Sequence, residues 1–482
     1  MIYLKKIYFL LLLLFSLPAV CQNLDSLSKI YTLKIVLPAD SSAKLSIHQI
    51  RITGNKKTKL PVILREIQFL PGDSILSYKL LKEIELARQQ VYNTTLFNTV
   101  LIEPLQISSS QVDILVTVKE RWYIYPLPQF QPVDRNLNEW LVKYRADFSR
   151  IKYGVKFVDY NLTGNRDVLK IYLLNGYTRN ISFTYAQPFS SKALMEGFIF
   201  GAGYAQSREV GYQTTYNNKL LFYKNGNFVN DNFFITAGYS FRKAIKTRHF
   251  FNLSFTKASI NDSIASIVYN PNYFKNGEVS KSFLDFSYTY RYANADNIIY
   301  PLKGETGFAT ISKRGFGFTG GINMFYVEGA FNKYINLKNN WFASMQLAGK
   351  IKLPFNQPYY NQKALGYGDA TLRGLEYYVI DGAAYGIIKT TLKKKLLSFS
   401  VPLPFKSAYF NSIPFTFYAK TYADIGYAAN NKKYDTYLNN KFLFTRGIGI
   451  DIVTLYDISF RFEYSFNQLG QKGLFLQAQG GF

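Results

Sequence analysis

The sequence predicts a mainly β protein, in which a C-terminal transmembrane antiparallel β-barrel of about sixteen strands follows one small α+β domain. Two segments near the C-terminus predict the barrel most clearly. In segment 457–466 every even position is aromatic or aliphatic and every odd position is polar or charged, and segment 474–482 repeats the alternation and ends on Phe482. Because successive side chains of a strand point to opposite faces, each segment has an apolar face for lipid and a polar face for a hydrated lumen.

The composition supports a membrane barrel rather than a cytosolic enzyme. Aromatic residues make up 17% of the chain, with 40 tyrosines and 41 phenylalanines, and charged residues make up only 18%. Aromatic side chains concentrate where a barrel meets the two membrane interfaces. Alternation recurs upstream, for example in segment 284–292. Dividing segment 140–482 by about ten residues for each strand, plus a turn or loop, gives the count of about sixteen.

The first 21 residues predict a secretory signal peptide, in which Lys5 and Lys6 precede an apolar run at 7–17. Cleavage after Cys21 fits the small residues of segment 18–21, and lipidation of Cys21 is the alternative. Segment 22–44 is expected to be a linker. No later run approaches the ~18 apolar residues of a membrane helix, so the chain would cross a membrane with strands.

Few residues are available for covalent or metal chemistry. Cys21 is the only cysteine, and the only histidines are His48 and His249. A disulfide in the mature chain, a metal cluster, a catalytic triad and a Gly-x-Ser-x-Gly elbow are therefore not expected, and we predict neither a cofactor nor an enzyme. The formal charge of +26 has two readings. In the first, the lysines only lie on the turns and rims of an exported barrel; in the second, they attract anionic lipid headgroups or an acidic client.

Segment 45–120 is predicted to form the small α+β domain. Alternation around Ile50 predicts a strand, and Pro61 fits the first turn of a short helix that ends near Gln68. Ser77 could cap a second helix, whose apolar face is formed by Leu80, Ile84, Ala87 and Val91. Two further strands follow at 100–102 and 112–118. Segment 121–139, which is rich in proline, is expected to be a stiff junction, and the barrel is expected at 140–482.

A long loop between predicted strands at 341–353 and 383–397 contains Leu372, Arg373 and Gly374. On the predicted strand at 416–427, alternation places Tyr422, Asp424 and Gly426 on the lumen face. If the loop folds inward, Arg373 can form a charge-assisted and bidentate bond to Asp424, with Gly426 leaving room beside it. Glu463, which also faces the lumen, is the second candidate partner of Arg373.

Two sets of residues carry a resemblance to known families. Segment 45–120 resembles a polypeptide-transport-associated (POTRA) domain through Ile52-Thr53-Gly54-Asn55-Lys56-Lys57-Thr58, Leu64-Arg65-Glu66, Pro71-Gly72-Asp73 and Leu96-Phe97. The remainder resembles the BamA/TamA-like outer-membrane protein assembly and translocation superfamily, or bacterial surface antigens, through Leu372-Arg373-Gly374, Tyr422-Ala423-Asp424-Ile425-Gly426, Tyr300-Pro301-Leu302-Lys303-Gly304 and Phe482. Leu375 departs from the aromatic residue usual after Arg-Gly, and a single POTRA-like module suits a smaller paralogue.

The resemblance implies a protein of the bacterial outer membrane, with its POTRA-like domain in the periplasm, that assists insertion or translocation of client proteins. The domain's sheet edge and the barrel seam would capture the client as an added strand, and an Arg373 to Asp424 ion pair would anchor the lumen loop. The C-terminal strand signal is Leu474, Leu476 and Phe482, and Gly480 and Gly481 suggest a weak seam. Expected partners are unfolded or secreted clients, outer-membrane lipids and subunits of an assembly machinery, but no nucleic acid.

Two other functions remain open on the sequence. In a passive pore or substrate transporter, the two charged residues only anchor a constricting loop, and the POTRA-like domain is a structural spacer. An outer-membrane hydrolase is the third class, for which the chain has little suitable chemistry.

Overall fold

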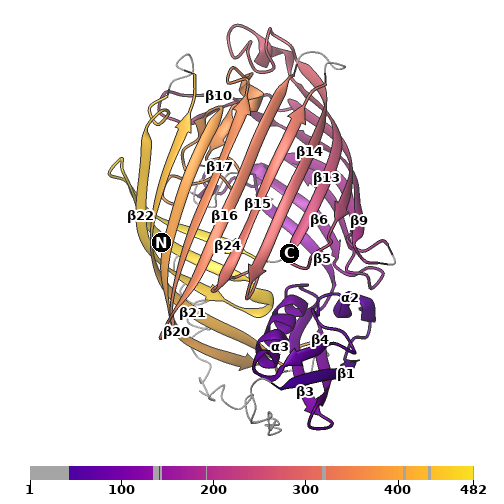
Figure 1. Cartoon of the computed structure of the whole chain (residues 1–482). Coiled ribbons are helices and arrows are strands. Elements are labelled where there is room, and N and C mark those ends of the chain that lie inside the picture. Colours follow the sequence, from indigo (N-terminus) through magenta and orange to yellow (C-terminus); the bar gives the residue numbers. More distant parts are fainter. Residues whose placement is uncertain are drawn as a thin grey trace.

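The computed structural model describes residues 43–480, except 134–139, 142–143, 192, 317–321, 405–408 and 432–435. The expected signal peptide at 1–21, nearly all of the expected linker at 22–44, and Phe482 lie outside the described residues. Figure 1 shows a small α+β domain beneath a large curved sheet. Among the described residues, no helix combines the length and apolar character needed to cross a membrane.

The small domain packs two helices on a four-stranded sheet. Its elements are β1 (Lys44–Thr53), α2 (Leu60–Leu64), β2 (Ser74–Leu76), α3 (Ser77–Tyr92), β3 (Phe97–Gln106) and β4 (Gln111–Glu120). The sheet order is β2-β1-β4-β3, in which β1 and β4 run parallel and the outer pairs antiparallel. One apolar cluster joins the sheet to α3 through the expected Leu80, Ile84, Ala87 and Val91.

Two local predictions for this domain are wrong. Helix α2 ends at Leu64 rather than near Gln68. Ser77 does not cap α3, because it is the first helical residue, and Leu76 is the N-cap without a side-chain capping bond. The short strand β2 leads directly into α3, and the backbone N–H of Ser77 donates to Ala43 O at 2.9 Å. A strand pairing therefore fixes the start of this helix in place of a side-chain cap.

The large sheet has sixteen strands, which confirms the predicted count. Its neighbours pair antiparallel, in chain order apart from two small inserted sheets. The strands are β5 (Ile124–Pro132), β6 (Ile151–Asp159), β7 (Val168–Gly176), β8 (Thr178–Gln187), β9 (Glu196–Ser207), β12 (Asn230–Phe241), β13 (Thr247–Ile260), β14 (Ser280–Ala295), β15 (Gly304–Arg314), β16 (Met324–Lys338), β17 (Trp341–Leu353), β20 (Ala384–Pro402), β21 (Ser412–Ala429), β22 (Phe442–Val453), β23 (Ser459–Asn467) and β24 (Lys472–Gln479).

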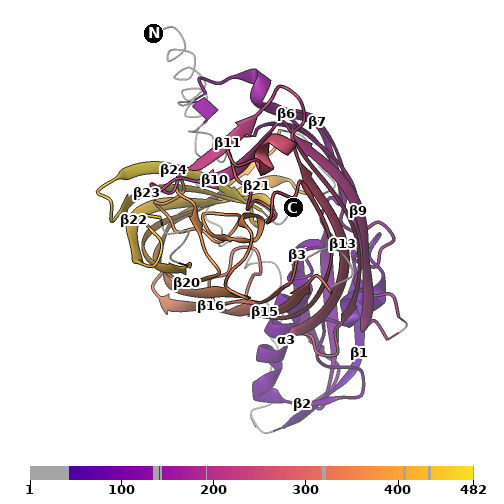
Figure 2. The ribbon, with the colours of Figure 1, turned by 90° about the horizontal axis from the view of Figure 1, so that it is seen from above.

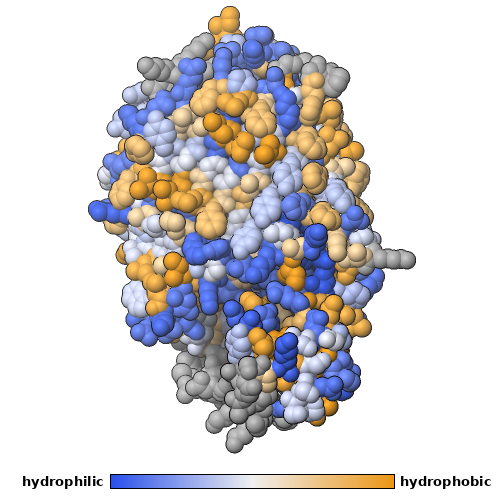
Figure 3. Space-filling model, in the orientation of Figure 1, coloured by the Kyte–Doolittle hydropathy of each residue, from blue (hydrophilic) through white to orange (hydrophobic). Residues whose placement is uncertain are grey.

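The sheet curls into a barrel (Figure 2). Outward side chains on strands around the sheet, such as Phe286, Leu347, Ile425 and Phe462, are exposed, whereas residues of the opposite parity face the interior. Figure 3 shows apolar side chains in patches over the outer face of the strands, with hydrophilic ones between them. The alternation in segments 457–466 and 474–482 therefore corresponds to the outer and inner faces of β23 and β24.

The barrel starts earlier than expected. Strand β5 lies inside segment 121–139, which was expected to be a junction, so the sheet begins at Ile124 rather than at residue 140. Prolines 126, 128 and 132 are part of this strand and do not stiffen a linker. The physical reason is that β5 is an end strand of the sheet, where proline is tolerated because one side of the strand has no ladder to break.

Two small sheets lie within the long loops. One is the hairpin of β10 (Glu209–Thr214) and β11 (Leu220–Lys224), and the other pairs β18 (Lys363–Leu365) with β19 (Ile380–Asp381). In Figure 2 the connection between β17 and β20 lies inside the ring of strands. We refer to residues 366–379, between β18 and β19, as the inward loop.

The small domain docks on one rim of the barrel through buried polar contacts. The carboxylate of Glu66 accepts two bonds from Arg242, one of them at 2.8 Å, and both side chains are buried. Asn93, after α3, donates to Ala295 O at 2.8 Å and accepts from the N–H of Ile298 at 3.1 Å. Tyr92 donates to Asp457 at 2.9 Å. These contacts fix the orientation of the small domain relative to the strands.

Candidate functional site

The tip of the inward loop packs against the inner wall of β21. A Cβ atom added to Gly426 would lie 2.6 Å from Cδ1 of Leu372, so only glycine lets the buried Leu372 side chain approach this closely. Gly374 has a φ of +89°, and an added Cβ there would lie 2.9 Å from Cβ of Ser465 on β23. Both glycines therefore serve a close approach of loop and wall.

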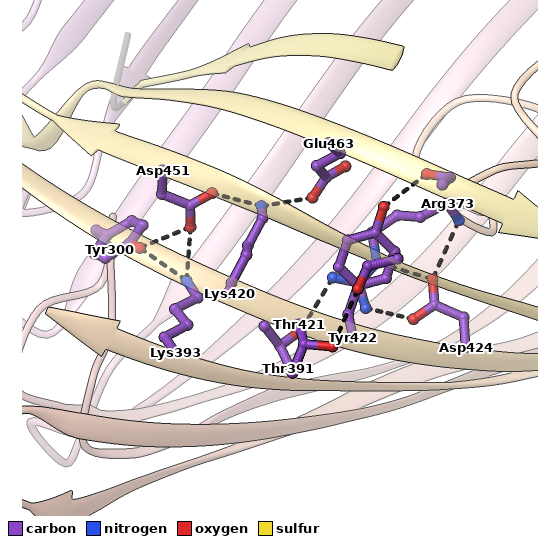
Figure 4. Close-up of polar contacts among 12 residues, drawn as sticks. Tyr300, Arg373, Thr391, Lys393, Lys420, Thr421, Tyr422, Asp424, Asp451 and Glu463 are labelled. Atoms are coloured by element: carbon purple, nitrogen blue, oxygen red, sulfur yellow. Dashed lines mark hydrogen bonds and ion pairs between the residues drawn. The ribbon is translucent and has the colours of Figure 1, made fainter. Parts of the chain in front are cut away.

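Arg373 is held between β20 and β21 (Figure 4). Its Nε donates to Oδ2 of Asp424 at 2.9 Å, its backbone N–H donates to the same oxygen at 3.1 Å, and Nη2 contacts Oδ1. Nη1 also donates to Oγ1 of Thr391 at 3.0 Å, and Nη2 donates to Thr390 O at 3.1 Å. The fork geometry of a guanidinium suits this bidentate contact with a carboxylate.

Tyr422, which lies on β21 with Asp424, also contacts the guanidinium of Arg373. The guanidinium carbon of Arg373 lies 4.0 Å from the centre of the Tyr422 ring, a cation–π geometry. The Tyr422 hydroxyl and Oγ of Ser465 are 2.6 Å apart, which ties the ring to β23. Asp424 itself is fully buried, with 0% of its surface exposed. A carboxylate buried to this degree requires such partners.

Glu463, the second candidate partner of Arg373, belongs to a different contact. Its Oε1 accepts from Nζ of Lys420 at 2.6 Å. Both residues register with Gly449 on the intervening strand β22, and an added Cβ on Gly449 would lie 3.0 Å from Cε of Lys420. The glycine leaves the gap through which Lys420 reaches Glu463, so the hydrogen bond of Glu463 goes to Lys420, whereas Arg373 bonds to Asp424.

The same lysine joins a second charged cluster that the sequence analysis missed. Asp451 forms ion pairs with Lys420 at 2.5 Å and with Lys393 at 3.0 Å, and it accepts from the Tyr300 hydroxyl at 2.7 Å. Figure 4 shows these residues beside the Arg373 contact on the inner wall. The alternation of β22 places Asp451 on the lumen face, a signal that was present in the sequence. Tyr300 belongs to the motif at 300–304, but nothing in that motif indicates its contact with Asp451, which it reaches from the turn between β14 and β15.

The inward loop is also fastened to the last two strands and to the β10–β11 hairpin. Asn467 donates to Gly374 O at 2.8 Å, and the Tyr378 hydroxyl donates to Gln471 at 2.8 Å. The rings of Tyr377 and Phe475 are 5.6 Å apart. Asn218, which is fully buried, accepts from the N–H of Val379 through its backbone oxygen at 3.0 Å. The loop is therefore held against the inner wall from β20 to β24.

Electrostatics at the rim reflect the burial of the docked domain. Burial raises the pKa of the Tyr92 hydroxyl, and the neighbouring carboxylate of Asp457 adds to the effect. Arg166, in the turn between β6 and β7, has its pKa lowered to about 10, chiefly by burial. Both shifts favour the neutral form, as expected for groups withdrawn from water. Within the described residues, no cluster of His, Cys, Asp and Glu suits a metal ion.

The C-terminal strand signal is only partly described. Leu474 and Leu476 lie on β24 and point outward, with 52% and 53% of their surface exposed. Phe482 and Gly481 lie outside the described residues. The large sheet ends at β24 on one side and at β5 on the other, and no ladder joins these two strands in the described part of the chain.

Comparisons with known proteins agree with this architecture. Residues 45–121 match the family model of the POTRA domain, described as a surface antigen variable number repeat. The solved structure of BamA from Haemophilus ducreyi lacking POTRA domains 1–3 matches with a TM-score of 0.50 and 15% identity, over 90% of this chain and 83% of that chain. CdiB from Escherichia coli matches with a TM-score of 0.51 and 11% identity, over 91% of this chain and 76% of that chain. No curated protein sequence matches the chain.

These similarities confirm the predicted fold. The chain has one POTRA domain, and its architecture is that of BamA and CdiB. The resemblance inferred from the sequence motifs is thus confirmed at the level of the fold.

Proposed function

We propose that this chain is a bacterial outer-membrane protein that assists the insertion or translocation of client proteins, with the barrel in the membrane and the POTRA domain in the periplasm. The observation that carries the proposal is the pair of end strands, β5 and β24, which no ladder joins in the described part of the chain. One fold can serve unrelated functions, so the proposal rests on this seam rather than on the likeness to BamA and CdiB alone.

A sheet edge inside a membrane is useful to a client strand. In hydrocarbon, an unpaired backbone N–H or C=O costs several kcal/mol, so a strand cannot enter lipid alone. An edge that offers backbone groups pairs with those of the client and lowers this cost, whatever the client's side chains are. The role requires no covalent step and no cofactor, and the proposal assigns no enzyme activity to the chain.

The POTRA domain is proposed to capture clients before they reach the barrel. Its sheet ends at β2, which has three residues, and at β3, which has ten. The longer strand β3 is the better site for an added strand, because each further residue pair adds backbone bonds. Clients are proposed to be unfolded or secreted proteins, and outer-membrane lipids and subunits of an assembly machinery are the other proposed partners.

The contact between Arg373 and Asp424 is proposed to hold the inward loop in the lumen during this cycle. The loop contacts β20, β21, β23 and β24, so its position is coupled to the strands on one side of the seam. A loop held in this way keeps the barrel from acting as an open channel while a client is bound.

Depletion of the protein in its own cells, followed by quantitative comparison of the outer-membrane proteome, tests the function. We expect a subset of outer-membrane or secreted proteins to fall at least several-fold and to recover when the gene is restored. An outer-membrane proteome unchanged by depletion would contradict the proposal.

The competing function is a passive pore with a structural POTRA spacer. The inward loop and the charged cluster around Asp451 occupy the lumen, which argues against an open channel. Planar-bilayer recordings separate the two functions, because a steady conductance that does not depend on any client would favour the pore.

A further inference from the structure

A cavity of about 220 Å³ lies where the POTRA domain meets the rim of the barrel, and we refer to it as the junction cavity. The POTRA domain lines it with Glu66, with Gln90 of α3, and with Asn93 and Thr94 just after this helix. The barrel lines it with residues of β13 and β14 and of the turns before β7 and β13. A ligand in this cavity would therefore contact the domain and the barrel together.

The junction cavity is strongly cationic. Five of its lining residues carry a positive charge: Arg166, Arg242, Lys246, Arg248 and Arg291. Among the described residues that line the cavity, Glu66 is the only carboxylate, and both of its oxygens already accept from Arg242. The other four cations form no ion pair with any described residue. The cavity thus holds an excess of positive charge that the described part of the chain does not neutralise.

Two of these arginines are held close to each other with their hydrogen-bond donors unused. Arg248 and Arg291 are directly opposite in the β13–β14 ladder, where like charges repel. Their guanidinium carbons lie 5.9 Å and 5.1 Å from the centre of the Phe250 ring, and a cation–π contact needs no N–H donor. Neither guanidinium donates to a described residue, so both forks are available to an anion.

Arg166 lines the same cavity from the turn between β6 and β7. Its φ of +62° lies in the left-handed region that residues with a side chain rarely adopt, and its N–H donates to Oδ1 of Asn161 at 2.8 Å. Within the described residues, its guanidinium makes one hydrogen bond, from Nη2 to Asn93 O at 3.4 Å. Backbone strain of this kind is concentrated at functional sites such as ligand clamps. The turn therefore holds a third guanidinium at the cavity with most of its donors unused.

A buried amide at the cavity also lacks a partner. Only 7% of the surface of Gln90 is exposed, and none of the described residues hydrogen-bonds its side-chain amide. Buried polar side chains are nearly always hydrogen-bonded, so this amide requires a partner from outside the described chain. Its NH₂ group would donate to an anion, as the three guanidinium groups would.

From these observations, we propose that the junction cavity binds a phosphate group, either of a lipid headgroup or free in solution. A phosphate monoester carries about two negative charges and three strong acceptor oxygens. A carboxylate carries one charge, and a single arginine fork matches both of its oxygens. Three arginines and an amide at one small cavity therefore suit a phosphate better than the carboxylate of an acidic peptide.

A neighbouring cavity of about 240 Å³ offers space for the rest of such a ligand. It shares Thr94, Arg166, Arg248 and Phe250 with the junction cavity. Its other walls include the apolar side chains of Val168, Ala186 and Ile199. An amphiphilic phosphate would place its charged group in the junction cavity and its apolar part against these walls.

A bound phosphate would connect Gln90 of the domain with the arginines of the barrel. Because it binds only where the two parts are docked, it would stabilise the docked position of the POTRA domain. The inference goes beyond the proposed function and requires no client for its test.

Calorimetric titration of inorganic phosphate into the purified full-length protein, in phosphate-free buffer, tests the inference. Arg248→Gln removes one guanidinium, and Lys243→Gln is the matched control, because Lys243 is exposed in the turn before β13 and does not line the cavity. Loss of one charge-assisted bond should weaken phosphate binding roughly tenfold in Arg248→Gln and leave Lys243→Gln like the wild type. Absence of phosphate binding to the wild type, or equal affinities of the two variants, would overturn the inference.

A second variant keeps the test decisive if Arg248→Gln fails to fold, which heat-modifiable migration reveals. Gln90→Leu removes a buried amide that has no partner among the described residues, so it should not lower the melting temperature in the absence of phosphate. It should nevertheless weaken phosphate binding roughly tenfold. Unchanged affinity together with a lower melting temperature would show that Gln90 has only a structural role, and would contradict the proposed site.

Two further probes identify the source of the phosphate. If a headgroup occupies the cavity, inorganic phosphate should bind more weakly to the protein in nanodiscs of phosphatidic acid than in nanodiscs of phosphatidylcholine. Equal binding in the two kinds of nanodisc would assign the cavity to free phosphate. Binding of a hexaglutamate peptide in place of phosphate, with the same loss in Arg248→Gln, would assign the cavity to acidic peptides and overturn the inference.

Discussion

Replacing Arg373 by alanine should release the inward loop from the barrel wall. The guanidinium donates to Asp424, Thr391 and Thr390, and Asp424 has no exposed surface. Removing one partner of a buried ion pair costs about 3–5 kcal/mol, because the other charge stays buried. Lys389 registers with Asp424 in the β20–β21 ladder and attracts it, so it compensates in part. We therefore expect the lower end of the range, about 3 kcal/mol.

Hydrogen exchange of the loop amides measures this change directly. The N–H groups of Leu375, Tyr378 and Val379 are all hydrogen-bonded in the closed loop. A cost of about 3 kcal/mol corresponds to roughly a hundredfold larger opening equilibrium, so these amides should exchange roughly a hundredfold faster in Arg373→Ala. Amides of distant strands such as β13 should not change, which controls for a general loss of stability. Arg373→Lys keeps the positive charge but loses the bidentate guanidinium, so its loop amides should exchange at a rate between those of the wild type and Arg373→Ala.

A double-mutant cycle gives the result that would refute the reasoning. Asp424→Ala should reproduce most of the acceleration, and the double variant should exchange no faster than the faster single variant. If the two losses add in free energy, Arg373 and Asp424 act independently, and the loop is not held by their contact.

Three further predictions concern the loop and the rim. Gly426→Ala should displace Leu372 and speed loop exchange, and Leu372→Ala in the same chain should restore slow exchange, because an added Cβ lies 2.6 Å from Leu372 Cδ1; no rescue would show that the glycine serves another purpose. Burial raises the pKa of Glu376, on the inward loop, from 4.5 to about 7, so the closed loop binds the proton more tightly than the open one. Protection of the loop amides against hydrogen exchange, corrected for the intrinsic pH dependence of exchange, should therefore fall as pH rises from about 4.5 to 7 and stay constant above that pH. Glu376→Gln should remove this pH dependence. Glu66→Ala should leave Arg242 buried without its carboxylate partner, which lowers the free energy of docking of the POTRA domain on the barrel by about 3–5 kcal/mol. The distribution of spin-label distances between domain and barrel should broaden in this variant and stay unchanged in the control Lys82→Ala.

The fold was largely predictable because period-two alternation survives in this chain almost without interruption. The expected strand at 341–353 coincides with β17, and segments 457–466 and 474–482 correspond to β23 and β24. Strand β5 was missed because a segment with Pro126, Pro128 and Pro132 looks like a linker in isolation. Only its position at the end of the sheet makes those prolines compatible with a strand, and that position is a tertiary fact.

The candidate site divides in the same way. Alternation places Asp424 on the lumen face, and the Leu-Arg-Gly motif identifies Arg373, so their meeting could be suggested from sequence. The contact of Glu463 with Lys420 could not be predicted, because it depends on the space that Gly449 leaves between the two side chains. Contacts such as Glu66 with Arg242 join residues far apart in the chain, and no local pattern indicates that two separate folding units will meet there.

The turn between β14 and β15 has two attachments, one on each side of the rim. Asn93 of the POTRA domain grips it at Ala295 and Ile298, and two residues further along Tyr300 extends into the barrel and donates to Asp451. A tilt of the domain that breaks the hydrogen bonds of Asn93 would also release segment 295–298, which positions Tyr300. Through this turn, a movement of the POTRA domain in the periplasm would be transmitted to Asp451 and its ion pairs in the barrel interior.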